Sequence, residues 1–263
     1  MHGLVRDTFD ELMDRKVIWI FLAITLFAML ISALISASDI QIKISQPGMD
    51  HAPENPFGDL PARGVSTFLS LLIFVSAMTA ASTIPSMLSR GRIDFFASKP
   101  VSRSGLYFGR FFGLVIVFGT ICLISGGIVY SLLAVIMKPF NIGVLYIFLF
   151  ALIELFVWLS IVAAVGLMTG STTVAIVTAF LFWITQTLLG ARQFIEALTD
   201  SQAVKYILDT LYWIVPKTSQ LSKDGLALAM DSELDQWLTT PATLAFGLFA
   251  LFGAAMIFNR KEL

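Results

Sequence analysis

Charged residues are scarce in this chain. They make up 13% of its 263 residues, whereas 57% are hydrophobic and 23 are phenylalanine. Soluble domains carry about 25% charged residues. So apolar a composition excludes an ordinary soluble domain. It predicts an all-α, polytopic membrane protein, because helices satisfy their own backbone hydrogen bonds in lipid.

Side chains that catalyse reactions or bind metals are also few. The lone Cys122 excludes an intrachain disulfide, and His2 and His51 have no Cys or His nearby, which argues against a zinc-type site. No Gly-Lys dipeptide occurs, so the chain lacks the phosphate-binding loop G-x-x-x-x-G-K-[S/T]. The net charge of −1 gives no field that would recruit nucleic acid. We therefore expect no catalytic residue, metal, cofactor or nucleic-acid partner for this chain.

Six apolar runs are close to the roughly 20 residues that a membrane-spanning helix needs. The predicted spans cover residues 17–36, 65–88, 111–137, 142–168, 172–189 and 242–258. An even number places both termini on one side. Lys and Arg are denser in the short segments of that side, which predicts cytoplasmic termini and a cell (inner) membrane location. Residues 1–263 are then one transmembrane domain.

Two segments outside the spans have their own patterns. Residues 1–16 repeat apolar side chains at helical spacing, which predicts an amphipathic helix on the cytoplasmic membrane surface. A solvated acidic tail is the alternative. Residues 190–240 form the predicted extracytoplasmic segment. Within it, residues 203–215 predict a helix that lies on the outer surface or dips into the membrane.

Glu154 is the one ionisable residue near the middle of a predicted span. Such residues usually face the bundle interior or a polar cavity, and they often mark a transport pathway. The structural alternative is a protonated or hydrogen-bonded side chain. We take a place in a transport pathway or a subunit seam as the hypothesis for Glu154.

Residues 89–110 form a charged island between the second and third predicted spans. Each charge would cost roughly 2.5–3.5 kcal/mol at the centre of a membrane helix, so the island lies outside the bilayer, on the cytoplasmic side. Pro100 predicts the end of a short helix at Lys99. The island's single acid is Asp94, and its basic residues are Arg90, Arg92, Lys99, Arg103 and Arg110. It also holds Phe95 and Phe96, which could instead dip into lipid headgroups.

The run 91–103, followed by Gly109 and Arg110, resembles the first cytoplasmic loop of type 2 ABC transporter permeases. That family has an acid, two bulky apolar residues, a basic-Pro step and an arginine, which here are Asp94, Phe95, Phe96, Lys99, Pro100 and Arg103. The six spans, the amphipathic N-terminal helix and the ending at residues 258–261 are similar as well. The subgroup that this chain looks like serves multicopper-enzyme maturation, gliding or sodium export.

The resemblance implies the permease subunit of an ATP-driven exporter. The helix at 91–99 would fit a cleft of a separate ATPase subunit, which would bind ATP and Mg²⁺. Arg92 and Asp94 would make polar contacts there, and Phe95 or Phe96 would supply the apolar anchor. A second permease chain, identical or different, would complete the transporter. The alternative is a non-catalytic membrane scaffold or assembly factor whose island binds anionic lipid.

Overall fold

The expected all-α class is confirmed. The computed structural model describes residues 2–14, 16–37, 60–86, 103–137, 141–190, 202, 206, 210, 215–232 and 238–260. Within these residues the chain forms α-helices and no strands. The helices are α1 (His2–Asp14), α2 (Val17–Ala37), α3 (Leu60–Ser86), α5 (Arg103–Met137), α6 (Val144–Thr169), α7 (Thr172–Gly190), α10 (Thr218–Ala229) and α11 (Thr239–Arg260).

Five helices are long and apolar enough to cross a membrane, as expected of a multi-pass membrane protein. Their apolar parts are Pro61–Thr83, Ser104–Val135, Val144–Thr169, Thr172–Leu189 and Thr239–Asn259. Helix α2 is 21 residues long and consists almost wholly of apolar residues. Its apolar stretch within the described side chains is Val17–Ile31, which is shorter than these five.

Helix α6 is at the centre of the bundle. It packs against α3, α5, α7, α10 and α11, and over residues 157–167 its buried residues lie on all sides of the helix. A helix that is apolar all round is suited to such a buried position. The chain turns sharply after it at Gly170, whose φ of 65° is in the left-handed region that favours glycine. Helix α7 therefore returns alongside α6.

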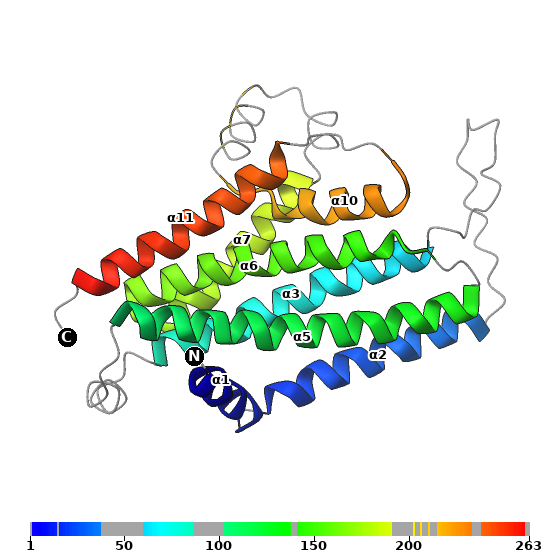
Figure 1. The fold of residues 1–263 in the computed structure, drawn as a ribbon. Helices are drawn as coiled ribbons and strands as arrows, with labels where there is room; N and C mark the ends of the chain where they lie inside the picture. The colour runs from blue at the N-terminus through cyan, green and yellow to red at the C-terminus, as the bar shows by residue number, and fades with distance from the viewer. Residues whose placement is uncertain are drawn as a thin grey trace.

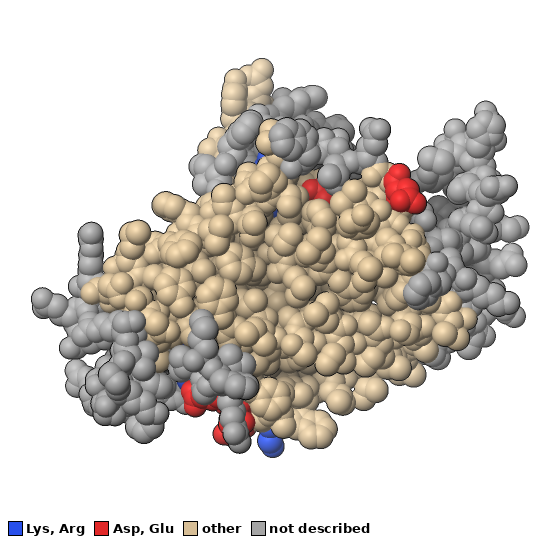
Figure 2. Space-filling view, in the orientation of Figure 1, with Lys and Arg blue, Asp and Glu red and all other residues tan. Residues whose placement is uncertain are grey.

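Helix α2 lies at the edge of the bundle. It packs mainly on α5, where the rings of Phe21 and Phe118 are 5.7 Å apart, and several of its large apolar residues, such as Trp19 and Phe27, are exposed. Exposed apolar side chains of this kind are suited to lipid. Figure 2 shows the same pattern on the face it draws: the described charges gather beside α1 and near α10, and the surface between them is uncharged.

The helices alternate in direction, so their ends gather at two ends of the bundle (Figure 1). Helix α1, the last turns of α3 and α11, and the first turn of α5 lie at one end, called here the terminal end. The turn between α5 and α6 lies at the opposite end. Helix α5 has 35 residues. At about 1.5 Å per residue it is about 52 Å long, well beyond a hydrocarbon core of about 30 Å.

Helix α10 was not predicted from the sequence. It is a 12-residue helix between α7 and α11, and it packs against α6 as well as α3, α7 and α11. Its composition is mixed, because it holds Lys223 and Asp224 beside small apolar residues. The helix predicted at residues 203–215 falls almost entirely outside the described residues.

Candidate functional site

The residues predicted to engage a partner fall mostly outside the described part of the chain. Arg92, Asp94, Phe95, Phe96, Lys99 and Pro100 all lie outside it. Arg103 is the first residue of α5. The structure therefore fixes the two helices that border this segment, α3 and α5, and places both of those helix ends at the terminal end of the bundle (Figure 1).

Arg110 joins α5 to α1 at that end. Its guanidinium forms ion pairs with Asp7 (Nη2 to Oδ2, 3.0 Å) and Glu11 (Nη1 to Oε2, 2.9 Å), and Nη1 also donates to the hydroxyl of Thr8 at 3.4 Å. Arg110 is 2% exposed. A buried guanidinium is stable only when carboxylates and hydrogen-bond acceptors surround it, so these α1 residues hold Arg110 in place.

The acidic side of α1 is thus not simply a solvated face. Thr8, Glu11 and Leu12 are buried, and α1 packs against α5, whereas Phe9 and Met13 are 45% and 43% exposed. The helix and its amphipathic pattern were predicted. The inward turn of Glu11 was not, and the reason is that the buried Arg110 needs a carboxylate partner. The exposed Phe9 and Met13 leave an apolar side available for the membrane surface.

Glu154 lies in α6 beside a small cavity between α3, α6 and α10, lined by both polar and apolar side chains. The side chain is buried, 6% exposed, and it lines the cavity together with Ser66 and Ser70 of α3 and Ser222 of α10. Among the described residues no basic side chain forms an ion pair with it. The indole N–H of Trp158, one helical turn further on, lies near the Glu154 carboxyl but outside hydrogen-bond geometry.

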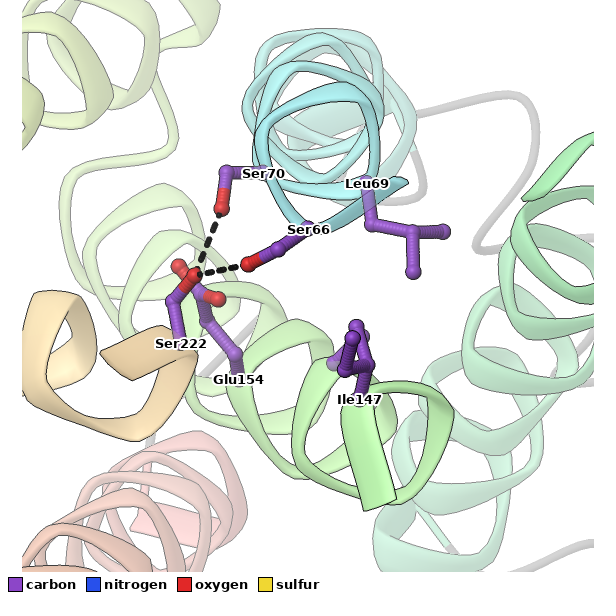
Figure 3. A pocket seen from close by; sticks show the side chains of 7 residues that line it. Ser66, Leu69, Ser70, Ile147, Glu154 and Ser222 are labelled. Atoms are coloured by element: carbon purple, nitrogen blue, oxygen red, sulfur yellow. Dashed lines mark hydrogen bonds between the residues drawn. The ribbon is translucent and has the colours of Figure 1, made fainter. Parts of the chain in front are cut away.

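The three serine hydroxyls converge on one another. Ser222 Oγ is 3.1 Å from Ser66 Oγ and 3.2 Å from Ser70 Oγ, so one hydroxyl of α10 joins two hydroxyls on successive turns of α3. Figure 3 shows all three serines and Glu154 directed into the same space between α3, α6 and α10. The apolar side chains of Leu69, Ile147 and Ala151 line the remainder of the cavity.

Close contact between α10 and α6 brings Ser222 to this place. The two helices run antiparallel, and a Cβ added to Gly225 would lie 2.9 Å from Cβ of Phe150. Farther along, the Asn141 side chain donates to the Ala229 carbonyl at 2.6 Å, which fastens the end of α10 to the turn before α6. Glycine at position 225 is thus what lets α10 lie directly against α6.

The other spans also hold α10 through buried polar groups. The Gln186 side chain of α7 donates to the Pro216 carbonyl (2.6 Å) and accepts from the Ser219 backbone N–H (3.2 Å). Asp224 accepts from Gln220 within α10 and from Thr240 of α11, at 3.0 and 3.2 Å. Each of these groups would be costly to bury without such partners.

Sequence reasoning identified Glu154 but missed its neighbours. Ser66 and Ser70 are four residues apart, which puts them on one face of a helix, and that spacing is the signal that could have been read. Ser222 carries no such signal, because it reaches the cavity only through the packing of α10 on α6. Asp7 and Glu11 are also four residues apart, and this spacing is the sequence signal that both carboxylates could face one basic residue such as Arg110.

Comparison with known proteins adds no family to this description. No family model matches the chain, and no curated protein matches it.

Proposed function

We propose that this chain is the membrane-spanning permease subunit of an ATP-driven exporter. Helix α2 crosses the membrane in addition to the five helices above, which makes six spans, and both termini lie in the cytoplasm. A separate ATPase subunit, carrying ATP and Mg²⁺, engages residues 91–99, and a second permease chain completes the transporter. The proposal rests on the sequence resemblance of the charged island, and the helix arrangement supports it.

One observation carries most of that support: α5 starts at Arg103, within the charged island and shortly after residues 91–99, and continues as one helix across the whole bundle. A force applied at residues 91–99 would act on the first turn of α5, and an uninterrupted helix transmits such a displacement along its length. Coupling of this kind requires a rigid element that joins the cytoplasmic end to the opposite end. The 35 residues of α5 form that element.

Contacts at the start of α5 would spread the displacement to other helices. Arg110 pairs with α1 through Asp7 and Glu11. The rings of Tyr107 and Phe108 lie 6.4 and 5.7 Å from those of Phe258 and Phe252 in α11. A movement of the first turns of α5 therefore bears directly on both α1 and α11.

The substitution Phe96→Asp tests the proposal. It replaces the proposed apolar anchor with a charge, which should abolish binding of the ATPase without affecting membrane insertion. The measurement is Mg²⁺-dependent ATP hydrolysis that co-purifies with the tagged chain from its native membrane in mild detergent. We expect the activity with the natural chain and its loss with Phe96→Asp.

Phe57→Asp is the matched control, since it makes the same change in the segment predicted to lie on the other side of the membrane. Its co-purifying ATPase activity should equal that of the natural chain. ATP hydrolysis that is absent from the natural chain, or unchanged by Phe96→Asp, would contradict the proposal. A chain that instead binds anionic vesicles through its island, with no ATPase, would favour the scaffold.

A further inference from the structure

We propose that the cavity between α3, α6 and α10 binds one alkali-metal cation of the size of sodium, held by Glu154, Ser66, Ser70 and Ser222. This inference goes beyond the proposed function and does not rest on it, since it concerns a binding site within this chain alone.

The hydroxyls of Ser66 and Ser70 behave differently from most of those on the spanning helices. Elsewhere, serine and threonine hydroxyls donate to the carbonyl one turn earlier in their own helix, which satisfies them locally. Examples are Thr25, Ser76, Thr120, Ser131, Ser160 and Thr185. Ser66 and Ser70 turn instead toward Ser222, as Figure 3 shows. Their hydroxyl oxygens thereby line the cavity.

A carboxylate at Glu154 gives the cavity one negative charge, which one bound cation would balance. Glu154 is more than nine-tenths buried and lines the cavity. No described basic residue forms an ion pair with it. An isolated carboxylate is costly inside a protein, and either a proton or a bound cation balances it; the converging hydroxyls favour the cation. One carboxylate matches a monovalent ion.

The ligand atoms and the cavity volume narrow the choice of ion further. The four side chains offer two carboxyl and three hydroxyl oxygens, with no nitrogen or sulfur, and such oxygens suit hard cations. The described residues contain no group of three or more His, Cys, Asp or Glu that could hold a metal ion. Ca²⁺ takes about six to eight oxygen ligands and Mg²⁺ keeps several waters. The cavity of about 10 Å³ has room for about one water-sized particle.

Equilibrium binding of radioactive sodium to the purified chain tests this site. The chain is held in detergent or lipid nanodiscs at fixed pH, and choline chloride keeps the ionic strength constant. We expect saturable binding of one ion per chain, with potassium competing less well. Glu154→Gln should weaken the affinity at least tenfold, and Ser222→Ala roughly tenfold, the size typical of altered metal surroundings.

Ser160→Ala is the matched control, because Ser160 is also buried on α6 but donates to the Phe156 carbonyl of its own helix. Its affinity should equal that of the natural chain. If Glu154→Gln fails to fold, Ser70→Ala and Ser222→Ala supply the same test. Absence of sodium binding, equal affinity in all variants, or occupancy that changes with pH but not with sodium would overturn the proposal. Sodium should also raise the unfolding temperature of the natural chain.

Discussion

At the scale of single residues, Arg110 shows why a charge near the start of a span can be structural. The sequence counts it among the basic residues of the island, and that count predicts a cytoplasmic position for it. Its partners do not follow, because Asp7 and Glu11 lie about one hundred residues away along the chain and their side of α1 could equally face water. Packing decides which side of α1 faces the bundle, because the Arg110 guanidinium is 2% exposed and must be neutralised by carboxylates.

Arg110→Ala should loosen α1. Removing one member of a buried ion pair costs about 3–5 kcal/mol, and the cost falls mainly on Glu11, because the Asp7 side chain is 52% exposed. We expect faster amide hydrogen exchange over residues 2–14 and little change in α6. The measurement is hydrogen exchange followed by mass spectrometry.

Two further variants sharpen this test. Asp10→Asn changes an exposed acid on the same helix and should leave the exchange of α1 unaltered. The pair Arg110→Leu with Glu11→Leu replaces the ions by apolar side chains, which is often close to neutral, so much of the protection should return. Natural exchange rates in Arg110→Ala would mean that α1 docks without the ion pair.

At the scale of helices, the long apolar elements could be predicted and α10 could not. Runs of about 20 apolar residues leave a helix as the ordinary solution in lipid, so the approximate positions of the spanning helices follow from composition. Helix α10 has no strong apolar run. Its position depends on residues from three other helices. Phe150 of α6 packs against Gly225, Gln186 of α7 donates to the Pro216 carbonyl just before α10, and Thr240 of α11 donates to Asp224. Contacts of this kind cannot be read from one segment.

Gly225→Ala should destabilise the chain. The new Cβ would be 2.9 Å from Phe150 Cβ and 3.3 Å from Phe150 Cγ, so α10 and α6 must move apart. Overpacking of this kind costs about 1–3 kcal/mol, offset by about 0.5–1 kcal/mol from the better helix propensity of alanine. We expect a lower unfolding temperature in detergent.

Gly253→Ala is the control for that experiment. It makes the same chemical change in α11 at a position where nothing lies within 4 Å of the new Cβ. Its unfolding temperature should be equal to or above that of the natural chain. A drop in both variants, or in neither, would contradict the close contact of α10 with α6.

At the scale of the whole molecule, the arrangement of the helix ends agrees with an even number of crossings. Helix α1 and the end of α11 share the terminal end, and the α5–α6 turn lies at the other (Figure 1). Hydropathy could predict which helix ends lie together, because successive spans run in opposite directions. Neither the cavity nor the central place of α6 could be anticipated, since both depend on which helix faces pack together.

Labelling of single cysteines should separate the two ends. In a Cys122→Ser background, cysteines at Lys16 and Asn259 test the terminal end, and cysteines at Ile142 and Ser232 test the other. All four positions are exposed. With a membrane-impermeant maleimide, we expect the second pair to react in intact cells and the first pair only after permeabilisation. Reaction of both pairs from one side would contradict the topology.

The position of α10 also has a consequence for biosynthesis. Chains are made from the N-terminus, so Ser66, Ser70 and Glu154 leave the ribosome well before Ser222. Until α10 arrives, the buried carboxyl of α6 lacks the helix that covers it, and a nascent chain in the bilayer exposes a polar patch there. A chain that stops before α10 therefore leaves Glu154 without the helix that covers it, and the bundle is complete only after α11, which packs on both α6 and α10, has also been made.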